Sequence, residues 1–214
     1  MQVSWMSSGF YRTCEWIWRL AYVNLLWLLF SLLGLVIFGV APATFAMFTV
    51  MRKWFLGEPD IPIYRTFIDS IKKDFLKANI IVLIFAALGY ILYFNYQYLG
   101  TIEGSMLTIQ TIGWYITMVL FLITLLFIIP VYVHFDMKLL QSIKTAFIIG
   151  IINPLALITL VISFVLAFYL FYYLPGLIPF FGVSLLGWIV MWCAHMSFGR
   201  IERKQEKLKA SSAV

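Results

Sequence analysis

Four stretches of this sequence contain no Asp, Glu, Lys or Arg, and each is long enough to cross a lipid bilayer. They cover residues 20–51, 78–102, 104–135 and 145–199. A membrane-spanning helix needs about 20 apolar residues. Charged residues make up only 11% of the chain, against about 25% in an ordinary soluble domain. This pattern excludes a soluble protein and predicts an integral membrane protein.

The uncharged stretches predict five membrane-spanning helices within a single domain over residues 1–214. The last stretch is too long for one helix, and Pro175, Gly176 and Pro179 mark a turn that divides it. Gly39 and Pro42 are expected to end the first span. We therefore expect an all-α polytopic membrane protein with spans at about 20–40, 78–99, 113–133, 146–173 and 180–196.

Two further segments have the pattern of amphipathic helices that lie at the membrane surface. In residues 62–77, large apolar residues recur at helical spacing and charged residues fill much of the remaining face. Docking of this helix to a partner is the alternative to a surface position. Residues 5–19, which are rich in Trp, predict a second interfacial helix, and residues 200–214 form a basic tail.

The distribution of Lys and Arg predicts the orientation, because cytoplasmic loops retain basic residues. Thirteen of them fall in the 41–77 loop, the 134–145 loop and the C-terminal tail, whereas only Arg12 and Arg19 fall on the opposite side. This count places the C-terminus in the cytoplasm and the N-terminus outside. One alternative remains open, in which residues 20–51 form a re-entrant hairpin bent at residues 39–42, so that Arg12 and Arg19 also lie inside.

The sequence gives little support for catalysis, metal binding or nucleic-acid binding. It lacks the metalloprotease, serine-hydrolase and phosphate-loop motifs. His134 and Asp136 are two residues apart and would not face each other on a helix. The net charge of +6 comes from residues that flank the spans. We therefore expect a non-enzymatic protein without a cofactor or metal, which contacts the lipid bilayer and no nucleic acid.

Two amides and several small or backbone-breaking residues are expected to face neighbouring helices. An amide in hydrocarbon needs hydrogen-bond partners, so Asn24 and Asn153 are predicted to join helices, with a polar substrate path as the alternative. Pro154 follows Asn153 and removes a backbone donor. Pro42 and Ala43 are candidates for close helix packing.

Three blocks of the N-terminal half resemble the YesL-like family of bacterial membrane proteins. They are Asn24-Leu25-Leu26-Trp27, the segment from Gly39 through Pro42-Ala43-Thr44 to Ala46, and Arg52-Lys53-Trp54 with the four residues that follow. Phe67, Phe75 and Asn153-Pro154 also fit the pattern. The resemblance implies a bacterial cell-membrane protein of unestablished activity, often encoded among genes for carbohydrate uptake, and it implies no catalytic residues.

Two functional hypotheses follow from these observations. The first is an accessory component of carbohydrate uptake that binds a partner, such as the subunits of a sugar transporter, through the 61–77 helix with Lys72 and Lys73 and through the tail. The second is a small transporter or channel in its own right, for which a homo-oligomer and a polar cavity around Asn24 and Asn153 are expected.

Overall fold

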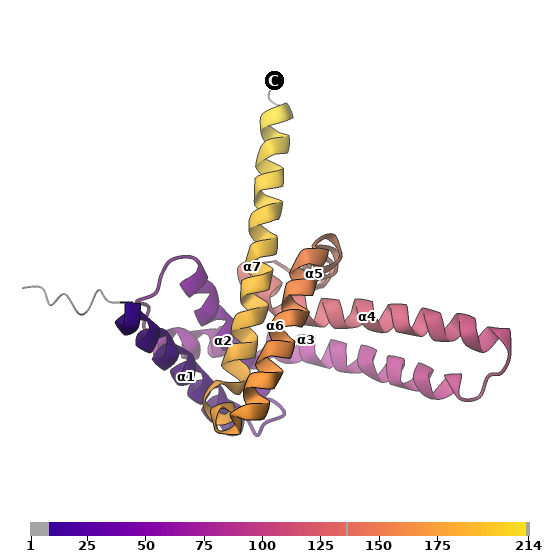
Figure 1. Ribbon diagram of the computed structural model, residues 1–214, viewed down its shortest axis with the longest axis horizontal. Coiled ribbons are helices and arrows are strands. Elements are labelled where there is room, and N and C mark those ends of the chain that lie inside the picture. Colours follow the sequence, from indigo (N-terminus) through magenta and orange to yellow (C-terminus); the bar gives the residue numbers. More distant parts are fainter. Residues whose placement is uncertain (1–8, 136, 213–214) are drawn as a thin grey trace, which may run out of the picture.

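The computed structural model describes residues 9–135 and 137–212, which form an all-helical polytopic protein (Figure 1). No strand occurs among these residues. Five helices are long and apolar enough to cross a membrane, which confirms the predicted fold class. Their spanning segments are Tyr11–Leu33, Ile63–Leu99, Ser105–His134, Pro154–Tyr173 and Pro175–Arg200.

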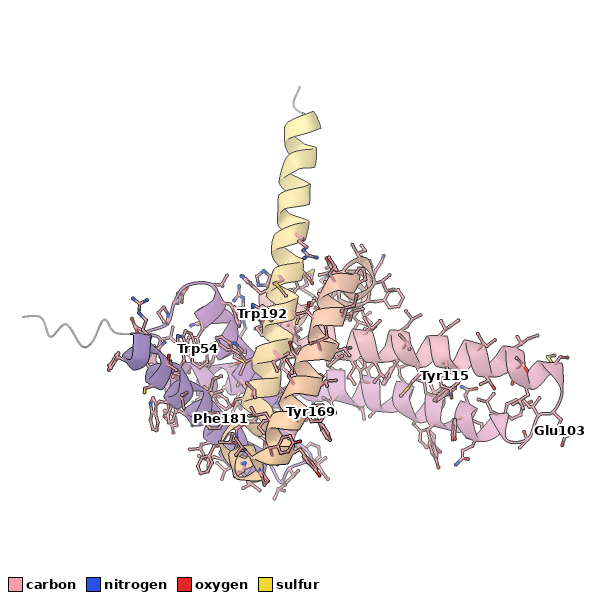
Figure 2. The ribbon with its side chains drawn as sticks, in the orientation of Figure 1. Trp54, Glu103, Tyr115, Tyr169, Phe181 and Trp192 are labelled. Carbon is pink, nitrogen blue, oxygen red and sulfur yellow. The ribbon has the colours of Figure 1, made fainter. Side chains whose placement is uncertain are left out.

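The described residues form seven α-helices and one short 3-10 helix. They are α1 (Gly9–Leu33), α2 (Val40–Phe55), α3 (Ile63–Leu99), α4 (Ser105–His134), α5 (Leu139–Ile152), α6 (Pro154–Tyr173), η2 (Pro175–Leu177) and α7 (Ile178–Ser212). In Figure 1, α6 and α7 lie side by side, and the hairpin of α3 and α4 extends away from them. Figure 2 shows Glu103 at the tip of this hairpin, far from Trp54 on α2.

Helices α1 and α2 form an antiparallel hairpin, which agrees with the hairpin alternative for residues 20–51, although the chain turns at residues 34–39 rather than at 39–42. The Trp16 and Trp54 rings lie 5.6 Å apart at one end. Nearer the turn, Trp27 Nε1 donates a 2.9 Å hydrogen bond to Thr44 Oγ1. The first span therefore ends at Leu33 rather than near residue 40. Pro42 does not end a helix, because it lies in the first turn of α2, where its missing N–H has no helical partner to lose.

Helix α2 occupies the centre of the molecule. Its 16 residues are about 24 Å long, which is short of the roughly 30 Å hydrocarbon core. Ten of them are buried, among them Pro42, Ala43 and Ala46. Small side chains at this position allow neighbouring helices to approach closely. Helix α2 thus serves as the common packing partner of α1, α3, α4 and α7.

The predicted interfacial helix at 62–77 is not a separate segment, because α3 continues through it into the second span. The buried face of α3 is one stripe that crosses the boundary without a break. It consists of Phe67, Ser70, Asp74, Ala78, Ile81 and Phe85. Phe67 is completely buried, whereas Tyr64 and Phe75 from the predicted apolar face are exposed. The stripe includes Asp74, which the sequence pattern assigns to the charged face.

The predicted fourth span, 146–173, divides at Asn153 and Pro154. Pro154 is the first residue of α6, and α5 ends just before Asn153. Helix α5 packs tightly on α4, where a Cβ added to Gly150 would lie 2.2 Å from Ile123 Cγ2. The α4 span is longer than the predicted 113–133.

The two ends of the chain continue transmembrane helices instead of forming separate surface elements. The described part of the predicted N-terminal interfacial helix, residues 9–19, is the beginning of α1, and residues 5–8 lie outside the described residues. The basic tail extends α7 to Ser212. Figure 1 shows this end of α7 projecting beyond the other helices.

Candidate functional site

A polar cavity of about 440 Å³ lies between the end of α2, the first turns of α3 and the end of α4. We call this the basic end of the molecule, because Arg52, Lys53 and Lys73 lie there. Helices α2 and α3 contribute polar residues at helical spacing, whereas α4 contributes three consecutive residues at its end. The lining residues are Thr49, Arg52 and Lys53 of α2, Thr66, Asp69, Ser70, Lys73 and Asp74 of α3, and Tyr132, Val133 and His134 of α4. The cavity brings together Arg52, Lys53 and Lys73, three of the residues that the sequence singled out as candidates for partner or packing contacts.

The inner wall of the cavity is a set of hydrogen-bonded polar groups, of which Asp74, Ser70 and Tyr132 are buried and Thr49 is partly buried. The Tyr132 hydroxyl donates a 2.8 Å hydrogen bond to Asp74 Oδ1. Thr49 Oγ1 donates to the Phe45 carbonyl at 2.9 Å and lies 3.0 Å from Ser70 Oγ. A hydroxyl has one proton, so Ser70 must be the donor to Thr49. Both hydroxyl protons are therefore used, and this wall offers acceptor oxygens to the cavity.

The mouth of the cavity carries the cations. Arg52 and Lys53 are partly buried, and Lys73 and Asp69 are exposed. None of the three cations forms a salt bridge with a described residue. Asp69 is paired outside the cavity, weakly, with Arg65 at 4.0 Å. The three cations outnumber the two carboxylates, so the cavity carries a positive charge.

The N-terminal end of α1 lies at this same basic end. Arg19 is buried and pairs with Asp60 at 2.9 Å, and it also bonds to Glu15 and to the Pro59 carbonyl. Its guanidinium lies 5.4 Å from the centre of the Trp16 ring. The Trp16 ring in turn contacts Trp188 of α7 at 5.1 Å. Trp54 belongs to this aromatic cluster and is buried, so it supports the fold and does not line the cavity.

The two histidines also lie toward the basic end. His134 lines the cavity and stacks on Phe198 of α7 at 4.5 Å. His195 lies one helical turn before Phe198 on α7, and its ring centre is 5.5 Å from that of Phe55. Asp136, two residues after His134 in the sequence, is outside the described residues. Among the described residues, no three His, Cys, Asp or Glu side chains gather as metal ligands would.

Asn24 joins α1 to the beginning of α7. Its Nδ2 donates to the Pro179 carbonyl at 2.8 Å, and its Oδ1 accepts from the backbone N–H groups of Val183 and Ser184. In an α-helix, residue 183 would donate to residue 179. The Asn24 amide therefore hydrogen-bonds both the carbonyl of residue 179 and the N–H of residue 183, the two groups of this helical turn.

Asn153 and Lys72 lie apart from the cavity. Asn153 is buried at the break between α5 and α6, and its Nδ2 bonds to the Ile149 carbonyl at 3.0 Å. Lys72 is exposed on α3.

Sequence reasoning missed the residues of the inner wall. Asp74, Ser70 and Thr49 are ordinary in sequence, and Tyr132 is one of twelve tyrosines. Asp74 and Tyr132 are 58 positions apart, so no local motif joins them. The spacing of Asp74 from Phe67 and Ile81, seven residues on each side, is the one sequence signal that places it on a buried stripe.

Comparison with known proteins connects the chain to bacterial proteins of unknown function. Residues 20–96 match the family model described as "Protein of unknown function, DUF624". The uncharacterized protein YesV of Bacillus subtilis (strain 168) is 39% identical over 94% of this chain and 97% of its own length. YteU of the same organism is 37% identical over 90% and 86%, and YesL is 31% identical over 96% and 97%. No solved structure matches. The match over nearly the whole length of these relatives shows that the chain belongs to the YesL-like family of DUF624 proteins.

Proposed function

We propose that this protein is a non-enzymatic accessory component of carbohydrate uptake in a bacterial cell membrane, and that it binds sugar-transporter subunits through its cytoplasmic, basic end. The observation that carries the docking role is the arrangement of the first turns of α3. Phe67 and Asp74 face the interior, whereas Arg65 and Lys72 are exposed. The link to carbohydrate uptake rests on the family resemblance.

The exposed surface of this segment combines charge with apolar area, as protein interfaces do. Tyr64 and Leu76 are exposed beside the two cations, with 52% and 73% of their surface accessible. A helix that only filled space in the membrane would not need two exposed cations beside large apolar side chains. The basic tail on α7 extends from the same end.

Affinity purification from native membranes tests this role. The tagged protein is isolated in mild detergent from cells grown on a complex polysaccharide or on glucose, and the co-purifying proteins are quantified by mass spectrometry. We expect stoichiometric recovery of sugar-transporter subunits, and at least tenfold lower recovery after Arg65→Glu with Lys72→Glu. Lys73 is left unchanged because it lines the cavity.

The matched control is Lys138→Glu with Lys144→Glu, which makes the same change of four charge units at two exposed positions, one directly before α5 and one on it. Recovery from this variant should equal that from the wild type. Recovery of the protein alone, or only as a homo-oligomer, would contradict the accessory role.

The second candidate, a small transporter or channel, has less support. It required a polar cavity around Asn24 and Asn153, yet the Asn24 amide satisfies helix backbone groups and Asn153 is buried against its own helix. The observation in its favour is the polar cavity at the basic end. Reconstitution in proteoliposomes tests it, because oligosaccharide flux above that of empty vesicles would favour a transporter over an accessory protein.

A further inference from the structure

We propose that the cavity between α2, α3 and α4 binds the phosphate ester of a polyol, with Arg52, Lys53 and Lys73 around the phosphate and Asp74 facing the hydroxyl groups. This binding site does not depend on the proposed accessory role.

The charge of the cavity selects an anion. Arg52, Lys53 and Lys73 contribute three positive charges, and Asp69 and Asp74 contribute two negative charges. Asp69 also lies 4.0 Å from Arg65, outside the cavity. The cations form no salt bridge with a described residue, and the Nε of Arg52 is buried without a hydrogen-bond partner among those residues. Phosphate is a suitable partner, because guanidinium and ammonium groups form strong charge-assisted hydrogen bonds with it.

The inner wall selects a ligand that also carries hydrogen-bond donors. Asp74 is buried, and its carboxylate has one donor in Tyr132. The hydroxyl protons of Thr49 and Ser70 are used within the wall. A bare anion would place its charge near Asp74 and gain nothing from these acceptors. The hydroxyl groups of a polyol donate to acceptors and add no charge. A polyol phosphate therefore suits both the cations at the mouth of the cavity and the acceptor oxygens of its inner wall.

A zwitterion such as phosphoethanolamine fits less well. Its ammonium group would suit Asp74, but it cancels one negative charge of the phosphate, so the excess positive charge of the cavity attracts it less strongly than glycerol 3-phosphate. The volume of about 440 Å³ accommodates a phosphate with a short polyol and leaves room for water.

The same chemistry can come from a lipid headgroup or from a soluble compound. Phosphatidylglycerol carries a phosphate and a glycerol diol, and the cavity lies at the basic end, where anionic headgroups gather. Glycerol 3-phosphate carries the same groups in solution. The two sources are distinguished by testing each one separately.

The first measurement is calorimetric titration of glycerol 3-phosphate into the full chain in nanodiscs of phosphatidylcholine. The second is native mass spectrometry of the protein released from nanodiscs that contain phosphatidylglycerol. We expect saturable binding of at least one of the two probes. Arg52→Gln and Lys73→Gln should each weaken it about tenfold, the effect of one lost charge-assisted contact. Inorganic phosphate and phosphoethanolamine should bind more weakly than glycerol 3-phosphate if the soluble probe is the ligand.

The matched control is Lys144→Gln, which removes an exposed cation outside the cavity and should change the affinity less than twofold. Circular dichroism and size-exclusion chromatography show whether each variant is folded. Lys73 is exposed, so its loss is expected to leave the fold unchanged. The proposal is overturned if neither probe binds, or if Arg52→Gln and Lys73→Gln bind as well as the wild type. It is also overturned if Lys144→Gln loses as much affinity as these two variants. Tighter binding of phosphoethanolamine than of glycerol 3-phosphate, with no retention of phosphatidylglycerol, would overturn it as well.

Discussion

Asn24 shows how a single side chain fixes the relative position of two helices that are far apart in sequence. Its amide satisfies backbone groups at residues 179, 183 and 184 of α7. A side chain without an amide would make none of these hydrogen bonds, and α1 would lose this polar contact with α7. Side-chain hydrogen bonds between membrane helices contribute about 1–2 kcal/mol at most, so the effect of losing this contact should be local and measurable.

We predict that Asn24→Leu lowers the free energy of unfolding by about 1–2 kcal/mol and accelerates amide exchange at Val183 and Ser184. Hydrogen–deuterium exchange of the peptide that contains these two residues provides the measurement. Asn95→Leu is the control, because Asn95 is exposed and bonds only to Ile91 of its own helix. Equal exchange rates in the two variants would show that Asn24 does not hold α7.

The hydrogen bond from Tyr132 to Asp74 is the central polar contact between α3 and α4. Both side chains are buried, and the bond to a carboxylate is charge-assisted. We predict that Tyr132→Phe and Asp74→Asn each lower stability by about 1–3 kcal/mol, and that the double variant loses about 1–2 kcal/mol less than the sum of the two. Thermal unfolding of the four proteins in the same detergent measures this coupling. Strict additivity would mean that the two groups do not interact.

At the scale of elements, the turn between α1 and α2 decides the architecture of the N-terminal half. Residues 34–39 turn the chain without polar turn residues, and Leu35 and Val36 adopt positive φ angles of 55° and 63°. Gly34 and Gly39 approach each other closely. A Cβ on Gly39 would lie 2.5 Å from the Ser31 carbonyl oxygen and 2.7 Å from that of Phe30. The backbone cannot move away from such a contact without opening the turn.

We predict that Gly39→Ala destabilises the protein by about 2 kcal/mol or more, because the added methyl group overlaps backbone atoms. Gly113→Ala is the matched control. Nothing lies within 4 Å of the corresponding Cβ, and alanine favours the interior of α4 by about 1 kcal/mol. Thermal unfolding should therefore move in opposite directions in the two variants. A Gly39→Ala protein as stable as the wild type would contradict the close approach of α1 and α2.

The number of spans was predictable because it depends on long uncharged segments, which any bilayer requires. The central helix α2 was not, because it lies within one such segment and the turn before it consists of apolar residues. The break at Asn153 was visible as a proline, but the length of the apolar run favoured one continuous span. The cations of the cavity were recognisable as candidates. The wall that faces them depends on contacts between α3 and α4, which no local pattern records.

At the scale of the whole molecule, the α1–α2 hairpin changes the distribution of charge. The count of Lys and Arg residues in the sequence assumed that the chain crosses the membrane once between Arg19 and Arg52. It therefore placed Arg12 and Arg19 on the opposite side of the membrane from the other thirteen basic residues. In the structure, Arg19 pairs with Asp60 in the loop after α2. With α1 and α2 counted as a hairpin, all fifteen Lys and Arg residues of the sequence fall in segments on one side of the expected crossings, and the turns at 34–39 and 174–177 and the loop at 100–104 have none.

This one-sided distribution predicts that both chain ends lie in the cytoplasm, since basic residues are retained there. A membrane-impermeant maleimide applied to intact cells provides the measurement, with single cysteines introduced in a Cys14→Ser background. Gly9→Cys and Glu58→Cys should react only after the cells are lysed. Glu103→Cys at the tip of the α3–α4 hairpin and Gly176→Cys beside η2 should react before lysis. Reaction of Gly9→Cys in intact cells, with Glu58→Cys still protected, would mean that α1 and α2 together cross the membrane once, and the hairpin would then be wrong. Cys193 is buried, so it should stay silent in every variant.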